Sequence, residues 1–307
     1  MSFGSQIKNE VSKLEITKAE SISELSAIIR NNAIMSDEIK IYTENSSIAR
    51  RIFRLIKDIY NINSDIIILE KKVLNKKHVY LIYIREKVKE ILMDLAIVNE
   101  ENNIIDVPKE YILSDEEQIS AYLRGIFLSG GSINDPKTSQ YHLELLINNK
   151  THALYINNLL NNYNLNSKMI GRKKGYIVYI KEAEKISDFL RYIKAFNAVM
   201  YFEDIRIYRD HKNMTNRLNN CEQATIEKII ATAKKQIINI NNIKNQVGLD
   251  ILDEKLKETC EYRLKYPEVS LKELSEIISL ETDKKVTKSG LNHRFRKIRE
   301  LSNKIKE

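Results

Sequence analysis

The chain is poor in residues that stiffen, break or cross-link a fold. Its 307 residues include two cysteines, three prolines, eight glycines and no tryptophan. Two cysteines cannot form a disulfide framework or a four-cysteine zinc site, and so little proline and glycine excludes collagen-like or linker-dominated architectures. No apolar run approaches the ~20 residues that cross a bilayer, and the first fifteen residues lack the apolar segment of a signal peptide. These absences predict a cytoplasmic protein without membrane contact.

The positive charge of the chain is concentrated near its end. The formal net charge is +8, and the segment from Lys284 to Lys306 alone carries +8, with nine basic residues and one acid. Residues 1–283 carry only +1. Clustered positive charge is typical of nucleic-acid binding, because each neutralised phosphate releases condensed counterions. The alternative is a solvated basic tail.

The first two thirds of the chain contain a duplication. The segment Tyr80–Glu86 (YLIYIRE) recurs 96 residues later as Tyr176–Glu182 (YIVYIKE), and an amphipathic helix follows each copy. Each half begins with an apolar helix, at 24–33 and 121–131, and Ser47 and Thr151 are expected to cap a second helix. We therefore predict an α+β fold. Its parts are two α-β-α-β-β-α lobes at 1–105 and 106–205, a polar linker at 206–221, and an all-α domain at 222–307.

The last domain shows only helical periodicity. Helices are expected at 222–240 and 250–265, the second ending ahead of Pro267. Ser270 and Glu273 form a capping box that opens the next helix, and Thr287 is expected to cap the last one. In that last helix, four apolar residues at steps of four, three and three make one buried stripe. They are Leu291, Phe295, Ile298 and Leu301.

The opposite face of the last helix is polar and basic, as in the recognition helix of a helix-turn-helix domain, which reads base edges in the major groove. Asn292 and His293 are the predicted base readers, with Ser289 and Arg296 as second choices. The connection from Leu280 to Val286 is longer than the usual tight turn, and an ordinary surface helix is the alternative. The residues predicted to contact double-stranded DNA are Lys288, Ser289, Asn292, His293, Arg294, Arg296, Lys297 and Arg299.

One segment of each lobe resembles the LAGLIDADG motif of homing endonucleases. These segments are LRGIFLSGG at 123–131 and, more faintly, LSAIIRNNA at 25–33. The resemblance implies a two-lobed homing-endonuclease-like domain in which two such helices pack at the lobe interface. In the nucleases, aspartates at the helix ends hold divalent metals, which prefer oxygen ligands. The corresponding positions here are Leu128, Gly130, Arg30 and Asn32.

None of these four residues is an acid, so we expect a scaffold that binds no metal and does not cut DNA. The enzyme alternative is an endonuclease that uses displaced acids, with Asp135 and Asp37 as candidates. Asp135 begins the sequence DPKT, which favours a role in a turn. No phosphate-binding glycine loop occurs, and the histidines lack ligand spacing. Cys221 and Cys260 are expected to be buried apolar residues. No cofactor and no small-molecule ligand is predicted.

Both features together resemble the bacterial WhiA family of transcriptional regulators. The matching segments are AYLRGIFLSGGSINDP at 121–136, NRLNNCEQAT at 216–225, and VSLKELSEI with VTKSGLNHRFRKI near the end. The resemblance implies a degenerate LAGLIDADG domain and a C-terminal helix-turn-helix domain. It also implies sequence-specific binding at promoters and a role in cell division, chromosome segregation or sporulation. The expected location is the nucleoid, and other transcription regulators are further expected partners.

The role of the front lobes remains open at this point. They could serve as a protein-interaction module, with DNA contact confined to the terminal domain. Basic residues at 71–72, 76–77 and 172–174 could instead line a DNA-facing surface, although the sequence favours solvated loops for them.

Overall fold

The computed structural model describes residues 1–70, 78–138 and 140–306. Contacts divide the chain into two compact units, Met1–Arg209 and Asp210–Glu307. The segment 206–221, expected to be a polar linker, lies inside a single long helix, α8 (Phe196–Gln246), which begins in the first unit and continues into the second. The basic pairs at 71–72 and 76–77 fall outside the described residues.

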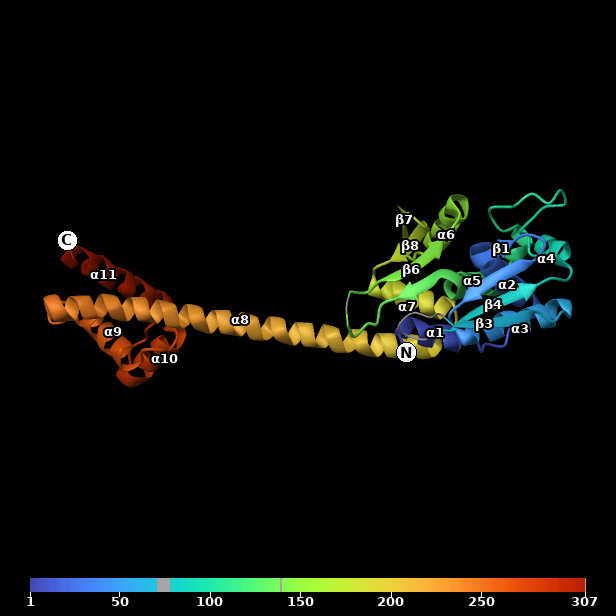
Figure 1. Cartoon of the computed structure of the whole chain (residues 1–307). Helices are drawn as coiled ribbons and strands as arrows, with labels where there is room; N and C mark the ends of the chain where they lie inside the picture. The colour runs from blue at the N-terminus through green and yellow to red at the C-terminus, as the bar shows by residue number, and fades with distance from the viewer. Residues whose placement is uncertain (71–77, 139, 307) are drawn as a thin grey trace. The chain divides into compact units, whose positions relative to one another are not determined.

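The first unit contains two lobes with the same order of elements (Figure 1). A short helix, α1 (Phe3–Val11), precedes the first lobe, and a 3-10 helix at Glu110–Ile112 precedes the second. The first lobe consists of α2 (Lys18–Asn32), β1 (Ala33–Met35), β2 (Ile39–Thr43), α3 (Ser46–Tyr60), β3 (Asp65–Glu70), β4 (His78–Ile84) and α4 (Val88–Asp94). The second lobe consists of α5 (Glu116–Gly130), β5 (Gly131–Ile133), β6 (Leu143–Ile147), α6 (Lys150–Asn162), β7 (Lys168–Arg172), β8 (Gly175–Ile180) and α7 (Ala183–Tyr192).

The two sheets have equivalent topologies, which agrees with the duplication seen in the sequence. Each is antiparallel and four-stranded, with the order β1-β2-β4-β3 in one lobe and β5-β6-β8-β7 in the other. The repeated segments form the inner strands β4 and β8, in which Ile84 pairs with Ile39 and Ile180 pairs with Leu143. The predicted α+β fold class is therefore confirmed. Each lobe has one more strand than expected, because β1 and β5 are only three residues long and show no readable alternation.

The caps of two helices differ from those expected. Asn45, not Ser47, caps α3, and its side-chain oxygen accepts hydrogen bonds from the backbone N–H groups of Ser47 (2.8 Å) and Ile48 (3.3 Å). In the second lobe, Asn149 caps α6 in place of Thr151 and accepts from the N–H of His152 at 3.0 Å. Asparagine is as good an N-cap as serine, so propensity alone did not decide between neighbouring candidates.

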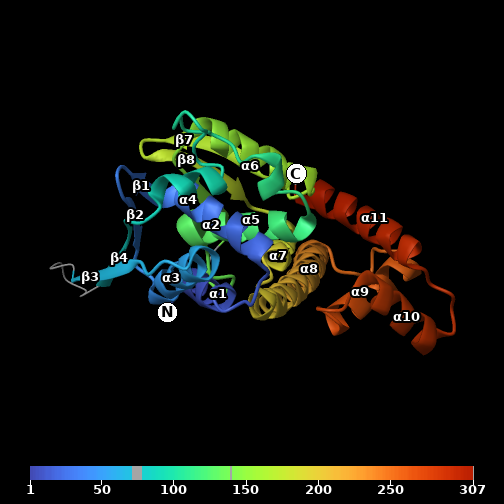
Figure 2. The same ribbon diagram turned by 90° about the vertical axis from the view of Figure 1, so that its right-hand side faces the viewer.

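The two lobes meet where α2 and α5 pack side by side (Figure 2). Gly125 permits this approach, because a Cβ atom there would lie 2.5 Å from the backbone oxygen of Glu24 and 2.7 Å from the Cβ of Ala27. Real Cβ atoms essentially never come within 3.0 Å of such neighbours. One continuous hydrophobic core then extends through both lobes.

A fully buried carboxylate links the lobes within this core. Glu24 of α2 accepts hydrogen bonds from Nε of Arg51 in α3 at 2.8 Å and from Nε of Arg124 in α5 at 2.6 Å. All three side chains are at most 2% exposed. Removing one member of a buried ion cluster is strongly destabilising, because the remaining charges lose their partner while staying away from water.

We expect Glu24→Gln to lower the free energy of unfolding of the first unit by about 3–5 kcal/mol, since two buried guanidinium groups would then lack an anion. Urea denaturation followed by circular dichroism measures this change. The matched control is Glu38→Gln, which removes the partly exposed pairs with Lys40 and Arg85 and should cost about 1 kcal/mol or less. Equal losses in the two variants would contradict the role assigned to Glu24.

The second unit contains the remainder of α8 together with α9 (Glu254–Lys265), α10 (Leu271–Thr282) and α11 (Lys288–Lys306). The helix expected at 222–240 is part of α8. A separate core joins these helices, with Ile243, Cys260, Leu274 and Leu291 among its buried members. The predicted capping box of α10 is confirmed: the Ser270 side chain accepts from the N–H of Glu273, whose carboxylate accepts from the N–H of Ser270.

The two cysteines have different environments. Cys260 is buried as predicted, and burial raises the pKa of its thiol to about 12. The expectation for Cys221 was wrong, because this residue is exposed on α8. Among the described helices, none combines the length and apolar character of a membrane span.

Candidate nucleic-acid interface

Helix α11 has one buried and one exposed face. Leu291, Phe295 and Ile298 are buried in the core of the second unit, and Leu301 packs against that core. These residues recur at helical spacing, so the remaining positions must face outward. The apolar stripe predicted from the sequence is therefore confirmed, and it determines which residues a partner of this helix can reach.

Hydrogen bonds fix the start of α11. The hydroxyl of Thr287 accepts from the backbone N–H of Gly290 at 3.1 Å, which is the predicted N-cap. The connection from α10 is held by Ser279, whose hydroxyl accepts from the N–H of Val286 at 3.0 Å. Asp283 ends α10 in the left-handed conformation. The longer connection is thus an ordered turn that sets the position of the last helix.

A groove of about 410 Å³ runs beside the exposed face of α11, and we call it the α11 groove. Its lining brings together five of the eight residues predicted to contact DNA, including both predicted base readers. Arg296 also forms an exposed ion pair with Glu300, one helical turn away, at 3.3 Å. The α11 residues that line the groove are Ser289, Asn292, His293, Phe295, Arg296 and Arg299.

The other three predicted contacts lie elsewhere. Arg294 faces α9, where its Nη1 donates to the hydroxyl of Thr259 at 3.1 Å and lies 3.6 Å from a carboxylate oxygen of Glu258. Lys297 is exposed outside the groove, and Lys288 lines a different pocket, between α8 and α10. Arg294 is therefore engaged in packing the domain, which leaves it poorly placed to bind a phosphate.

Helix α8 supplies a wall of the groove that the sequence did not reveal. Thr232, Lys235, Gln236 and Asn239 line it opposite α11. These residues lie 49 to 56 positions before the first residue of α11 and belong to no recognisable motif, so only the tertiary structure brings them into the site. Helical spacing places Lys235 and Asn239 on one face, but that spacing alone does not say what the face adjoins.

The first unit keeps the frame of a nuclease site without its acids. Of the four positions that correspond to nuclease aspartates, Arg30 reaches the backbone oxygens of Ala96 (2.6 Å) and Ile105, and Asn32 donates to the oxygen of Tyr42 at 2.7 Å. Leu128 is 2% exposed. Each of these side chains is thus used in packing or in satisfying backbone groups.

The fourth position, Gly130, has no room for a carboxylate. A Cβ atom there would lie 2.8 Å from Nδ2 of Asn31 and closer still to the backbone oxygen of Leu146. That same Nδ2 donates to Leu146 and to the hydroxyl of Ser129, both at 3.0 Å, so the neighbouring atoms are held in place. An aspartate could enter only if the backbone of β6 at Leu146 and the side chain of Asn31 moved away.

The displaced acids do not form a metal site either. Asp135 accepts a hydrogen bond from the N–H of Lys137 at 2.9 Å, as expected for a turn residue, and Asp37 is exposed in the bend before β2. Within residues 1–70, 78–138 and 140–306, no group of three or more His, Cys, Asp or Glu side chains is suited to hold a metal ion.

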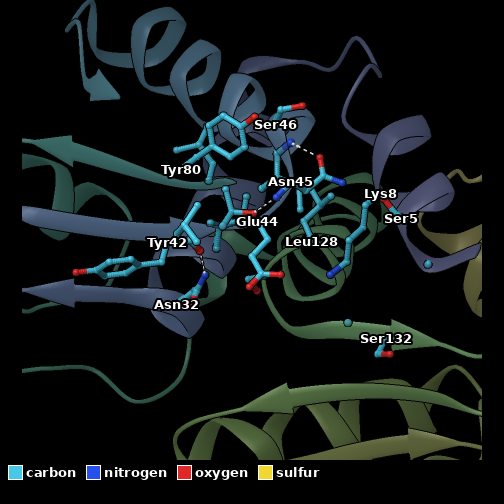
Figure 3. A pocket seen from close by; sticks show the side chains of 18 of the residues that line it. Ser5, Lys8, Asn32, Tyr42, Glu44, Asn45, Ser46, Tyr80, Leu128 and Ser132 are labelled. Carbon is cyan, nitrogen blue, oxygen red and sulfur yellow. Dashed lines mark hydrogen bonds between the residues drawn. The ribbon is translucent and has the colours of Figure 1, made fainter. Parts of the chain in front are cut away.

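A large pocket, about 1150 Å³ in volume, adjoins two of the positions that correspond to nuclease aspartates (Figure 3). Its lining includes Asn32 and Leu128, and Lys8 of α1 extends into it. The Lys8 ammonium lies 5.6 Å from the ring centroid of Phe127, and burial lowers its pKa to about 8. At neutral pH this group is still mainly protonated, so it places a positive charge in the pocket that Asn32 and Leu128 also line.

Three family models match nearly all of this chain. The WhiA N-terminal LAGLIDADG-like domain matches residues 18–98, the WhiA LAGLIDADG-like domain matches 119–212, and the WhiA C-terminal HTH domain matches 215–302. The chain belongs to the WhiA family. This result confirms the resemblance drawn from the sequence motifs.

Relatives in the WhiA family are similar over their whole length. A probable cell division protein WhiA of Bacillus cytotoxicus is 46% identical, and one of Staphylococcus haemolyticus is 43% identical. Both comparisons cover 100% of this chain and 98% of the relative.

Two solved structures share the fold. One, described as "full-length DUF199/WhiA from Thermatoga maritima", has a TM-score of 0.60 at 23% identity and covers 99% of both chains. The other, the N-terminal LAGLIDADG domain of DUF199/WhiA, has a TM-score of 0.50 at 22% identity and covers 62% of this chain and 92% of its own. Together with the family models, they confirm the predicted two-lobed LAGLIDADG-like fold followed by a helix-turn-helix region.

We expect Gly130→Ala to lower the free energy of unfolding of the first unit by about 2 kcal/mol or more, because the added methyl group must displace backbone atoms. Thermal denaturation of the full chain tests this expectation. The control is Gly171→Ala in β7, where a Cβ atom would meet only the Tyr176 ring at 3.8 Å. This variant should leave the unfolding temperature nearly unchanged. A Gly130→Ala variant as stable as the control would show that this position tolerates a side chain.

Proposed function

We propose that this WhiA-family protein is a sequence-specific DNA-binding transcription regulator that reads the major groove with α11. The observation that carries the proposal is the exposed face of α11, where Asn292, His293 and Arg296 adjoin one groove. Asparagine and arginine can each form paired hydrogen bonds with base edges, arginine preferring guanine and asparagine adenine. The buried opposite stripe holds the helix in the domain while this face stays open.

The contacts within the α11 groove have different roles in this proposal. Asn292 and His293 contact base edges, with Ser289 and Arg296 as further base contacts. Farther along the helix, Arg299 in the groove and Lys297 outside it bind phosphates, and Lys235 of α8 extends the same positive surface. Base contacts supply the discrimination between sequences, whereas phosphate contacts supply affinity and salt dependence.

We further propose that the protein acts at promoters on the nucleoid, in the cytoplasm, and contributes to cell division. The names of the relatives support cell division, because both are described as probable cell division proteins. Chromosome segregation and sporulation are related roles that the family resemblance implies. In this proposal the first unit is a scaffold without nuclease activity, which agrees with the four non-acidic positions at its helix ends.

We expect Arg296→Ala to weaken binding to target promoters about tenfold and to reduce the slope of log affinity against log salt, because one cationic contact with DNA is lost. Genome-wide mapping of the binding positions supplies the target fragments. Fluorescence anisotropy then measures the affinity and its salt slope between about 50 and 250 mM salt, a range that includes physiological ionic strength.

The control for Arg296 is Lys255→Ala, which removes an exposed positive charge from α9, outside the α11 groove. This variant should bind like the wild type. If Arg296→Ala has unchanged affinity at every salt concentration, Arg296 does not belong to the interface.

The endonuclease alternative predicts magnesium-dependent nicking of DNA that EDTA abolishes. We expect the purified full chain to leave supercoiled plasmid intact with Mg²⁺ or Mn²⁺ present, because the described residues contain no cluster of three or more carboxylate, imidazole or thiol groups suited to bind either ion. Gel electrophoresis of plasmid and of target promoter fragments measures the outcome. If the wild type nicks DNA and an Asp135→Asn variant does not, the first unit is an endonuclease and the proposed scaffold role is wrong.

A further inference from the structure

A second pocket in the terminal domain is lined by cations and hydroxyl groups. We call it the basic pocket, and its volume is about 400 Å³. It lies where α8 meets the start of α10 and the start of α11, and Thr232 of α8 lines both this pocket and the α11 groove. No aspartate or glutamate is among the residues that line it. The polar lining residues are Thr225, Lys228, Thr232, Arg263, Ser270, Lys272 and Lys288.

Arg263 of α9 is the unusual member of the basic pocket. It is 1% exposed, and its guanidinium lies 5.5 Å from the ring centroid of Phe295. Its Nη1 donates to the backbone oxygens of Val269 (2.7 Å) and Tyr266 (3.2 Å). Its Nε is buried without an acceptor among the described residues, and none of their carboxylates pairs with the side chain.

A buried cation without an anionic partner is unfavourable, because the charge has lost its hydration and gained no compensating charge. Burial lowers the pKa of Arg263, as this cost requires, although arginine remains protonated at physiological pH. An anion in the basic pocket would supply the missing partner. The carbonyl acceptors explain how the side chain is held, but they do not neutralise its charge.

The surroundings of Arg263 strengthen the attraction for an anion. Lys228 and Lys288 are exposed, and no described carboxylate forms an ion pair with them, while Lys272 reaches Glu276 only at 4.0 Å. Lys288 is the first residue of α11, whose first turn contains no acid, so the positive end of the helix dipole lies beside the lysine. The N-terminus of α10 contributes little, since its own Glu273 already caps it.

We propose that the basic pocket binds a phosphate group. Phosphate offers acceptors to guanidinium, ammonium and hydroxyl donors at once, and the pocket provides all three around one hollow. The phosphate belongs to the backbone of the duplex that α11 reads, because the basic pocket adjoins the α11 groove at Thr232. This last assignment rests on the proposed function, whereas the phosphate site itself does not.

The test of the phosphate site uses inorganic phosphate and the full chain. At constant ionic strength, replacing chloride by phosphate should raise the unfolding temperature of the second unit in a saturable manner, since ligand binding stabilises the folded state. The double variant Lys228→Gln/Lys272→Gln should weaken the apparent phosphate affinity at least tenfold. The control Lys234→Gln, on α8 but outside both pockets, should behave like the wild type. Arg263 is left unchanged because it also holds the chain after α9.

The source of the phosphate is decided with DNA. If it is the DNA backbone, Lys228→Gln should weaken binding about three- to tenfold on target and random duplexes alike and lower the salt slope by about 0.9. If phosphate stabilises the protein but this variant binds DNA normally, the pocket holds the phosphate of a free ligand. Absence of saturable stabilisation together with normal DNA binding by the variants would overturn the proposal.

These outcomes separate this proposal from the proposed function. A wild-type chain that binds no DNA would refute the function, and the phosphate titration would still decide whether the pocket binds an anion. Suppose that Arg296→Ala loses DNA binding, while phosphate leaves the unfolding temperature unchanged and Lys228→Gln leaves the DNA affinity unchanged. That result would refute only the phosphate site in the basic pocket.

Discussion

The first unit depends on the close contact between two helix backbones. Gly125 of α5 lets the main chains of α2 and α5 approach to a distance that no side chain would permit. Across the same contact, Glu24 binds Arg51 and Arg124 from neighbouring helices. Steric fit sets the spacing of the helices, and the buried charges add a requirement that all three side chains remain together. Two similar sheets are thereby held in one unit with one core.

This contact also involves the positions that correspond to the metal-binding aspartates of homing endonucleases. The helix ends that carry metal-binding aspartates in homing endonucleases are here drawn together by amide groups, with Asn31 bonded to Ser129 and Leu146 and Asn148 bonded back to Asn31. Gly130 occupies the tightest point. These positions are part of the lobe interface, where their residues contribute to packing, and Lys8 lines the same pocket as Asn32 and Leu128.

The second unit uses charge in a different way. Its core is small and apolar, and nine of its twenty lysines and arginines lie between Lys284 and Lys306, in α11 or just before it. Arg294 is neutralised by α9, but Arg263 is buried without an anion among the described residues. The helix-turn-helix region thus has two adjacent hollows with basic lining residues, the α11 groove and the basic pocket, which share Thr232.

Local patterns in the sequence were sufficient to predict many of the helices, strands and caps of this protein. The duplicated strands, the capping box at Ser270, the cap at Thr287 and the apolar stripe of α11 all follow from the spacing of residues a few positions apart, and the structure bears them out. The segments at 121–136 and 216–225 and those near the end also indicated the family, and the LAGLIDADG-like segments showed the missing acids.

Tertiary structure decided which residues share a site. It joined α8 to the α11 groove, turned Arg294 towards α9, and moved Lys288 into the basic pocket. It also showed that the expected linker at 206–221 and the helix expected at 222–240 belong to one helix, α8. Helical periodicity states which residues share a face of one helix, but the neighbour of that face is chosen by packing between segments far apart in the chain. That choice depends on the shape and charge of both surfaces at once, and no single segment of sequence contains it.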